Sequence, residues 1–330
     1  MSISHPRVSP AAVCALERIC PGAVATDVPL ARISRWRIGG LADVIVRPRS
    51  IDDLARLRAW LHAQGLQHVV IGATSNLLFA DQGLRVICVQ IGGAFAQLGI
   101  AGPEIIAGSG VWVPHLARRA MQAGLTGLEH TCGIPGTLGG LVCMNGGSQR
   151  KGIGDLIVSV TSVDTLGAIR TRSREECAFA YRRSIFQSCG EVVARAVMHL
   201  DTTLELRAIR QQMLAILGSR RRKFPQKLPN CGSVFVSDPA MYRDYGPPGA
   251  VVERLGFKGR RVGGALVSPQ HANFIVNTGG ATAADILILI TEIKAAVLAD
   301  TGYAMEVEVR FVTEAGEIMS PDAAAKRKFQ

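Results

Sequence analysis

Three short segments that lie far apart in the chain carry side chains able to do chemistry together. They are Tyr181-Arg182-Arg183-Ser184, Asn230-Cys231-Gly232-Ser233 and Glu306-Val307-Glu308-Val309-Arg310. An arginine presents a planar fork of donors to a carboxylate, and a serine hydroxyl donates a proton only with help from its neighbours. Because alternate residues of a strand share a face, Glu306, Glu308 and Arg310 would line one side of the last segment. From this alternation alone, a solvated edge strand is the simpler interpretation.

Two other kinds of catalytic site are disfavoured by the spacing of the residues. Ser233 follows Gly232, but no G-x-S-x-G elbow surrounds it, so a serine hydrolase is poorly supported. The seven histidines show neither H-E-x-x-H nor H-x-H spacing, and we expect no metal site. The eight cysteines form no C-x-x-C pair. We therefore expect them to be scattered thiols in a reducing compartment.

Two further segments have the composition of loops that approach a ligand closely. Ile71–Leu78 combines a strand end with a turn of small residues and hydroxyls, which suits either a phosphate or an ordinary strand-to-loop turn. Gly133–Gly147 contains six glycines in fifteen residues but is neither G-x-G-x-x-G nor a Walker loop. Glycine removes a side chain where another group must come close, at a cost in chain entropy. We predict that the second segment cradles a flat or phosphorylated cofactor.

Alternating strand and helix signals position these segments and indicate a mixed α and β protein. The strand signals are at 42–47, 68–71, 85–90, 104–107, 157–166, 192–200, 273–277 and 306–312. The helix signals are at 50–65, 114–123, 204–217 and 283–300. Ser50 with Asp53, and Thr282 with Asp285, have the spacing of capping boxes. The basic run Arg220–Lys223 reads as a solvated helix end, and would matter if a pyrophosphate lay nearby.

The composition limits the class of protein. The chain has 330 residues, 48% of them apolar, which excludes a mainly disordered protein. Its net charge of +11 fits an anionic substrate or a nucleic acid, but aromatic residues are only 5%, which weakens a stacking-based nucleic-acid site. The first 30 residues lack a long apolar run, and Ile286–Ile290 is too short to span a bilayer. We expect a cytoplasmic protein without membrane insertion.

Taken together, the segments resemble the UDP-N-acetylenolpyruvoylglucosamine reductase family, also called UDP-N-acetylmuramate dehydrogenase. The resemblance runs from about Arg37 to Phe311. It is carried by Arg37-Ile38-Gly39-Gly40, Gly72–Leu78, Gly133–Gly140 with Asn145, Tyr181-Arg182-x-Ser184, Asn230-x-Gly232-Ser233-Val234-Phe235, Val267-Ser268-x-x-His271-Ala272-Asn273-Phe274-Ile275-Val276-Asn277 and Glu308-Val309-Arg310-Phe311. The order and joint presence of these motifs are specific, although each alone is weak.

The resemblance implies an α+β architecture with three parts. Two subdomains would form an FAD-binding fold of the vanillyl-alcohol-oxidase type, one at 1–91 and the other at 92–222 with 302–330. A C-terminal α+β substrate-binding domain would occupy 223–301. The chain would return to the second FAD subdomain for its last strand.

The implied reaction is the NADPH-dependent reduction of the enolpyruvyl ether of UDP-N-acetylglucosamine to UDP-N-acetylmuramate, a step of peptidoglycan synthesis. NADPH would pass hydride to non-covalent FAD, and the reduced flavin would deliver it to the terminal carbon of the enolpyruvyl group. Ser233 matches the proton donor of the family, and Arg182 and Glu308 match its other two catalytic positions. The substrate-binding positions are Tyr181, Lys223, Asn230 and Gly232. The cofactor-binding positions are Ile71, Gly72, Ala73, Thr74, Ser75, Asn76, Leu77, Gly133, Ile134, Pro135, Gly136, Thr137, Gly139, Gly140, Asn145, Gly146 and Arg310.

Alternatives stay open at this stage. Gly72-Ala73-Thr74 has fewer glycines than the family usually has there, and Val236-Ser237-Asp238 stands where lysine is common. A paralogous flavin oxidoreductase acting on another nucleotide sugar is one alternative, and a basic nucleic-acid-binding protein is a remote one. A purified flavoprotein would be yellow, whereas a nucleic-acid binder would not. We expect a monomer whose only partner is its small-molecule substrate.

Overall fold

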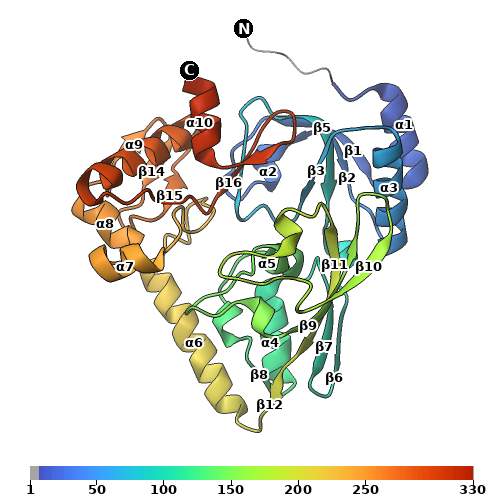
Figure 1. The fold of residues 1–330 in the computed structure, drawn as a ribbon, viewed down its shortest axis with the longest axis horizontal. Coiled ribbons are helices and arrows are strands. Elements are labelled where there is room, and N and C mark those ends of the chain that lie inside the picture. Colours follow the sequence, from blue (N-terminus) through green and yellow to red (C-terminus); the bar gives the residue numbers. More distant parts are fainter. Residues whose placement is uncertain (1–6, 330) are drawn as a thin grey trace.

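The computed structural model describes residues 7–329, and its first part is a small α/β unit at residues 7–91 (Figure 1). We call it the N-terminal unit. Its elements are α1 (Pro10–Ile19), β1 (Val24–Pro29), α2 (Leu30–Ile33), β2 (Leu41–Val46), α3 (Ile51–Ala63), β3 (His68–Ile71), β4 (Leu77–Phe79) and β5 (Leu84–Gln90). The sheet has the order β1-β2-β5-β3, with β2 and β3 parallel to β5. Parallel strands end at one edge of a sheet, so the turn after Ile71 lies at that edge.

The helix α3 begins at the predicted cap Ser50, but only half of the predicted capping box forms, since the Asp53 carboxylate accepts Arg49 N rather than Ser50 N. The Ser50 hydroxyl accepts the backbone N–H of Asp53, which satisfies one of the free N–H groups at the helix start. Leu54, Leu57 and Leu61 lie on one face of the helix and are fully buried in a cluster with strand residues of β2 and β5. This packing fixes the N-terminal sheet against one helix layer.

The middle unit, residues 92–223, is built on an antiparallel sheet with the order β10-β9-β11-β7-β6. Its strands are β6 (Leu98–Ala101), β7 (Glu104–Gly108), β8 (Leu125–Thr126), β9 (Ile157–Val163), β10 (Ile169–Ser173), β11 (Val192–His199) and β12 (Asp201–Thr202). Its helices are η1 (Gly93–Phe95), α4 (Val113–Gln122), η2 (Glu129–Thr131), α5 (Leu138–Cys143), η3 (Ile153–Asp155), η4 (Ile185–Gln187) and α6 (Leu206–Lys223). The helix α6 extends six residues past its predicted end and carries the basic run in its last turn.

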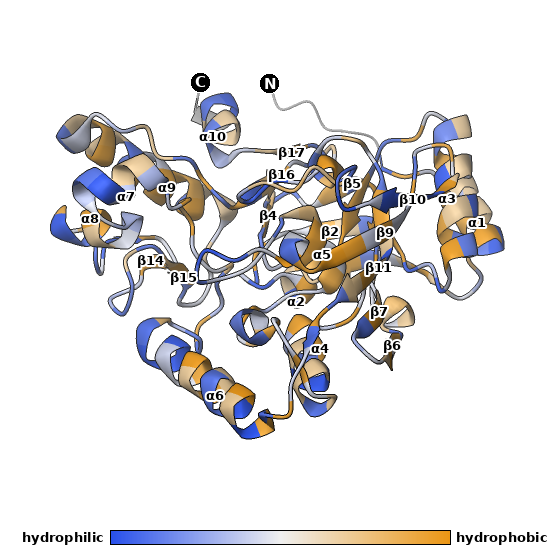
Figure 2. Ribbon diagram, turned by 60° about the horizontal axis from the view of Figure 1, so that its bottom comes forward, coloured by the Kyte–Doolittle hydropathy of each residue, from blue (hydrophilic) through white to orange (hydrophobic). Residues whose placement is uncertain are grey.

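The core of the middle unit lies between its sheet and the helices α4, α5 and α6. On α6 only Ile209, Met213 and Ile216 are buried, at helical spacing, and Figure 2 shows the helix banded in blue and orange. The helix therefore packs along one stripe and leads the chain from the middle unit to the C-terminal unit (Figure 1).

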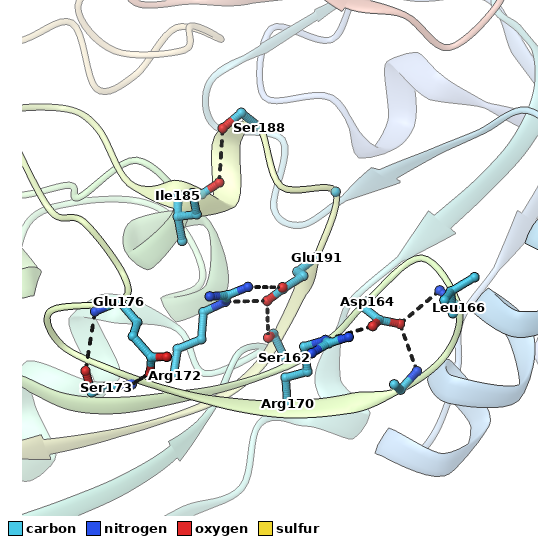
Figure 3. Close-up of polar contacts among 12 residues, drawn as sticks. Ser162, Asp164, Leu166, Arg170, Arg172, Ser173, Glu176, Ile185, Ser188 and Glu191 are labelled. Atoms are coloured by element: carbon cyan, nitrogen blue, oxygen red, sulfur yellow. Dashed lines mark hydrogen bonds and ion pairs between the residues drawn. The ribbon is translucent and has the colours of Figure 1, made fainter.

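Charged side chains brace β9, β10 and β11 (Figure 3). Glu191 accepts hydrogen bonds from Ser162 Oγ at 2.6 Å and from Arg172 Nε at 2.9 Å. Asp164 accepts the backbone N–H groups of Leu166 and Ala168 at the turn between β9 and β10. Each carboxylate thus satisfies several donors at once, which holds the edge of the sheet in register.

The C-terminal unit, residues 224–309, surrounds one long apolar helix. Its elements are α7 (Pro239–Tyr245), α8 (Pro248–Arg254), β13 (Arg261–Val262), β14 (Ala265–Val267), β15 (Ile275–Asn277) and α9 (Ala283–Thr301). Thr282 and Asp285 form the predicted capping box, and Gly302 ends α9 in the left-handed conformation. Trp36 of the N-terminal unit is fully buried in this core, where its Nε1 donates to the Ile275 carbonyl at 2.8 Å.

The last strand differs from our expectation. The strands β16 (Arg310–Val312) and β17 (Ile318–Met319) form a sheet with β4, and α10 (Pro321–Phe329) follows. β16 runs parallel to β4, with Arg310 opposite Leu77, and Val312 is buried among residues of the N-terminal unit. The chain therefore returns to the N-terminal unit rather than to the sheet of the middle unit. β4 and β16 are each only three residues long, so neither carries a local signal for its partner.

Residues 7–329 contain neither a membrane-spanning helix nor a cluster of metal-ligating side chains. No helix in this range is long and apolar enough to cross a membrane. No group of three or more His, Cys, Asp or Glu side chains in the same range has the arrangement of a metal site.

Candidate functional site

The two predicted close-approach segments meet in the structure. A Cβ added to Gly72 would lie 2.8 Å from Oγ1 of Thr137, and a Cβ added to Gly136 would lie 3.1 Å from Oγ of Ser75. Both separations are tighter than ordinary side-chain packing, so a side chain at Gly72 would force a shift and one at Gly136 would require the Ser75 hydroxyl to move by a few tenths of an ångström. The second segment is held in place because Val113 N donates to the Gly136 carbonyl at 2.9 Å. The turn after β3 and the loop before α5 therefore form one surface, which we call the glycine cradle.

Several other predicted cofactor positions are glycine because of packing within the chain. Gly139 N donates to the Ser109 carbonyl at 2.8 Å, and a Cβ at Gly139 would meet the Ser109 side chain. A Cβ at Gly146 would lie 2.5 Å from Cδ1 of Leu141, whereas Gly140 has ordinary space around it. The glycine density thus has two causes, since part of it serves backbone contacts and part of it forms the cradle.

The hydroxyls of the first segment have different surroundings. Thr74 is buried with φ of 55°, and its Oγ1 donates to the Ile33 carbonyl at 2.8 Å and accepts Arg35 N. That hydroxyl therefore anchors the loop after α2. The Ser75 hydroxyl makes no hydrogen bond with any residue in the described range. Of the two, only Ser75 remains open to a ligand.

Arg220 is an unanticipated member of the site. Its side chain packs on Gly133 and its guanidinium lies 4.9 Å from the centre of the Phe224 ring. Burial lowers the pKa of Arg220, and its buried Nε has no hydrogen-bond partner among residues 7–329. A partly buried guanidinium without an acidic partner in this range favours the presence of an anion. The basic run 220–223 was its only sequence signal, and we interpreted that run as a helix end.

The predicted catalytic residues Arg182 and Glu308 are in contact. Nε of Arg182 lies 3.4 Å from Oε1 of Glu308, and Nη2 of Arg182 donates to the Gly147 carbonyl at 3.0 Å. Arg182 has φ of 56°, an uncommon conformation for a residue other than glycine. Both charged side chains are about one-quarter exposed, so the pair is open on one side.

Asn145 holds the loop that carries Arg182. Its Nδ2 donates to the Ala180 carbonyl at 2.8 Å, and its Oδ1 accepts the N–H of Gly154 at 2.9 Å. Both ends of the amide are thereby occupied within the chain. The predicted cofactor position Asn145 is thus placed where it sets the position of residues 180–182.

Backbone contacts fix Glu308 beside β4. The Glu308 carbonyl accepts Nδ2 of Asn76 at 3.0 Å, and Arg310 N donates to the Asn76 carbonyl at 3.0 Å. Burial raises the pKa of Glu308, while the charges of Arg182 and Arg310 oppose that rise. The side chain of Arg310 forms no ion pair within the described range. Glu308 is therefore a carboxyl whose protonated form is favoured compared with an ordinary glutamate.

Ser233 lies next to this pair along the backbone. Phe235 pairs with Val307, and Glu308 N donates to the Val234 carbonyl at 2.8 Å, which places Ser233 one residue from the partner of Glu308. The turn before it needs Gly232, whose φ is 79°, and Asn230 Oδ1 accepts the Gly232 N–H at 3.0 Å. The Ser233 hydroxyl has no hydrogen-bond partner among the described residues.

The remaining predicted substrate positions lie at the margin. Tyr181 is half exposed, with the Arg182 guanidinium 5.5 Å from its ring centre. Lys223 is exposed at the end of α6. Asn145, Tyr181 and Arg182 also line a cleft of ≈ 520 Å³. Asn230 donates to the Pro225 and Leu228 carbonyls, so it shapes the turn that precedes Ser233.

Two family models match the chain. Residues 42–173 match an FAD binding domain. Residues 224–312 match the C-terminal domain of UDP-N-acetylenolpyruvoylglucosamine reductase. These matches confirm the predicted fold class, an FAD-binding fold followed by a C-terminal α+β domain.

Relatives and a solved structure agree with the models. UDP-N-acetylenolpyruvoylglucosamine reductase 1 of Corynebacterium glutamicum is 44% identical over 295 residues, which cover 89% of this chain and 87% of that protein. The reductase of Heliobacterium modesticaldum is 41% identical over 288 residues, or 87% of this chain and 90% of that protein. The crystal structure of the Thermus caldophilus reductase is similar with a TM-score of 0.74 and 29% identity, covering 86% of this chain and 97% of that one.

Proposed function

The chain belongs to the UDP-N-acetylenolpyruvoylglucosamine reductase family, and from that membership we propose how its own residues divide the reaction. It is an FAD-dependent oxidoreductase that reduces the enolpyruvyl ether of UDP-N-acetylglucosamine to UDP-N-acetylmuramate for peptidoglycan synthesis. We propose NADPH as the reductant. The contact between Arg182 and Glu308, whose N–H donates to the carbonyl of Val234 next to Ser233 in the chain, carries the proposal.

The glycine cradle fits a flavin nucleotide. Among the described residues, the Ser75 hydroxyl on this surface has no hydrogen-bond partner and the Arg220 guanidinium packed on Gly133 has no ion pair, which suits an anionic ligand. FAD, when bound, supplies hydride chemistry, accepting hydride from the nicotinamide and passing it to the terminal enolpyruvyl carbon. We propose that the segments 71–77 and 133–140 hold it, with Arg220 facing its negative charge.

Arg182 binds the substrate carboxylate. Hydride addition at the terminal carbon leaves negative charge on the carbon beside that carboxylate, and a fixed cation there lowers the energy of the transition state. The guanidinium fork matches a carboxylate geometrically, and Tyr181 supports it from its ring face. Burial raises the pKa of Glu308, which favours, compared with an ordinary glutamate, the protonated form that can donate a hydrogen bond to the same group.

Ser233 gives the proton that completes the reduction. Its hydroxyl makes no hydrogen bond within residues 7–329, and the turn at Gly232 and the pairing of residues 234–236 with 306–308 fix its backbone. A serine is a weak acid at neutral pH, so its proton moves only when the charge it meets is held close and water is excluded. The cationic Arg182 supplies the nearby charge.

Several finer points belong to the same proposal. We propose a substrate domain at 223–301, since α9 and its apolar cluster organise that region. We propose a cytoplasmic location, which the eight unpaired cysteines support. We also propose that the enzyme is a monomer, which light scattering of the purified protein tests directly.

The test is NADPH oxidation by the purified yellow protein with and without the enolpyruvyl nucleotide sugar. We expect oxidation to require the sugar and to yield UDP-N-acetylmuramate. A colourless preparation, or oxidation that another enolpyruvyl or nucleotide sugar supports better, contradicts the proposal. The second outcome favours the paralogue acting on a different nucleotide sugar.

A further inference from the structure

The cleft beside Arg182 is lined mainly by charge that the proposed reaction does not use. It has a volume of ≈ 520 Å³, and its charged lining residues are four cations, Arg150, Lys151, Arg174 and Arg182, and two carboxylates, Asp155 and Glu175. Only Arg182 belongs to the predicted catalytic set. The lining therefore has an excess of positive charge at the entrance to the substrate's carboxylate site.

Most of these cationic side chains lack a strong ion pair with the residues that the structure describes. Lys151 makes no ion pair or side-chain hydrogen bond with any residue that the structure describes. The Arg150 guanidinium lies 5.3 Å from the centre of the Tyr242 ring, and this contact engages no acid. Arg174 is 3.8 Å from Asp155, but both side chains are more than half exposed, so the pair is weak. The cleft can thus offer three cations to a ligand without breaking a strong interaction.

A strained turn presents two of these cations. Lys151 N donates to the Ser148 carbonyl at 3.1 Å, with φ of 57° at Gln149 and 63° at Arg150 between them. Turns with two positive φ angles favour glycine and asparagine, because a Cβ makes that conformation costly. Here the chain retains glutamine and arginine. Such strain persists where the side chain has a use that outweighs it.

We propose that this cleft is an anion subsite that binds a phosphate group of one of the enzyme's two nucleotide ligands. The proposal rests on the proposed function, and it adds Arg150, Lys151 and Arg174 to the residues that recognise substrate. Arg and Lys are the side chains that recognise phosphate, Arg through its fork and Lys as a point charge. The phosphate comes either from the diphosphate of the nucleotide sugar or from the 2′-phosphate of NADPH.

Two variants test the subsite without unfolding the protein. Arg150→Gly places glycine where φ is positive, so its melting temperature should equal or exceed that of the wild type. Lys151→Gln removes a charge from a side chain that makes no ion pair or hydrogen bond with the residues that the structure describes. The control is Arg118→Gln, which removes the same charge from an exposed position on α4 outside the cleft.

Calorimetry on the flavin-loaded protein at low salt measures binding of UDP-N-acetylglucosamine and, separately, of adenosine 2′,5′-bisphosphate. We expect the double variant to weaken one of the two by about tenfold, as for a lost charged hydrogen bond, and the control to stay within about twofold. Weakened UDP-N-acetylglucosamine binding assigns the cleft to the sugar nucleotide, and weakened bisphosphate binding assigns it to the reductant. The proposed subsite is overturned if the double variant binds both ligands as tightly as the wild type does. It is also overturned if the wild type binds neither ligand.

The outcome is separable from that of the proposed function. If the wild type fails to oxidise NADPH with the enolpyruvyl sugar, the proposed function fails, whereas the binding measurement still decides whether the cleft holds phosphate. If turnover is normal and binding is unaffected by the variants, only the subsite fails.

Discussion

Arg182 and Glu308 share an ion pair although one comes from a loop of the middle unit and the other from the segment that precedes β16. The 3.4 Å separation leaves Nε of Arg182 without a proper hydrogen bond, and both side chains remain partly exposed. A pair of this kind is not a strong structural contact. Its geometry leaves the guanidinium free to exchange Glu308 for a ligand carboxylate.

The first prediction concerns this guanidinium. Arg182→Lys keeps the positive charge but loses the planar fork, so we expect re-oxidation of reduced flavin by the enolpyruvyl substrate to slow by more than about tenfold. Reduction of the flavin by NADPH should change much less, because it involves no substrate carboxylate. Stopped-flow absorbance of the flavin follows both steps. The matched control is Arg183→Lys, at the exposed neighbouring position, and equal losses in both half-reactions for Arg182→Lys would indicate a structural role.

Much of the fold was predictable because its signals are local. Two helices were predicted from their periodicity and from their caps at Ser50 and Thr282, which act within a few residues. The strands at 68–71 and 192–200 were likewise predicted from local residue patterns. The pairing of β16 with β4 was not predictable, because two three-residue strands from opposite ends of the chain meet only in the folded state.

The sequence motifs indicated which segments form the site, but not which of their residues touch one another. The sequence indicated two close-approach segments, but not that Gly72 would face Thr137 or that Gly136 would face Ser75. Arg220 was missed because its significance lies in burial beside Gly133, which no sequence pattern records. The predicted alternation of exposed and buried residues at 306–311 agrees with the structure, although regular strand pairing begins only at Arg310.

The second prediction concerns the glycine cradle. Gly136→Val adds a branched side chain whose Cβ would stand 3.1 Å from Oγ of Ser75, so it crowds the surface between the two halves of the cradle. We expect the ratio of flavin to protein absorbance to fall strongly. The control is Gly218→Val on α6, where the nearest atom to the new Cβ is Arg222 Nη1 at 3.5 Å, and flavin content should be unchanged. Full flavin occupancy in a folded Gly136→Val protein would show that this surface is not the flavin site.

The third prediction concerns the stability of the middle sheet. Hydrogen bonds from Arg172 hold the pKa of Glu191 below its usual range (Figure 3). Since the folded-state pKa is the lower one, the ionised Glu191 contributes stability above the unfolded-state pKa and loses it as pH falls through the folded-state pKa. Glu191→Gln should therefore lower the free energy of unfolding at pH 7 by about 1.5–3 kcal/mol, the range for hydrogen bonds to charged groups.

Urea unfolding at several pH values measures this effect. The difference between Glu191→Gln and wild type should shrink as pH falls below about 4, where the unfolded-state carboxyl is protonated. Glu317→Gln is the control, because its ion pair with Arg327 joins two side chains that are more than half exposed. Its effect should stay within about 0.5 kcal/mol. A difference for Glu191→Gln that grows toward acid pH would contradict the assigned role.

The last prediction separates the two half-reactions at Ser233. Flavin reduction by NADPH needs no proton on the substrate carbon, whereas the second half-reaction does, because hydride addition leaves an enolate-like anion. The Ser233 hydroxyl makes no hydrogen bond to the chain within residues 7–329, so Ser233→Ala removes no stabilising contact and should leave the melting temperature and flavin content unchanged. Re-oxidation by the enolpyruvyl substrate should slow by roughly 10²–10⁴-fold, as for a lost general acid.

Ser237→Ala provides the matched control for this measurement. Ser237 lies on the same segment and its hydroxyl is likewise without a hydrogen bond to the described residues, so both half-reactions should proceed as in the wild type. Stopped-flow absorbance records flavin reduction and re-oxidation in one instrument, which removes differences in protein loading. If re-oxidation in Ser233→Ala stays within a few-fold of Ser237→Ala, the proton comes from another group. Glu308 is then the nearest candidate, because its raised pKa keeps it protonated at higher pH than an ordinary glutamate.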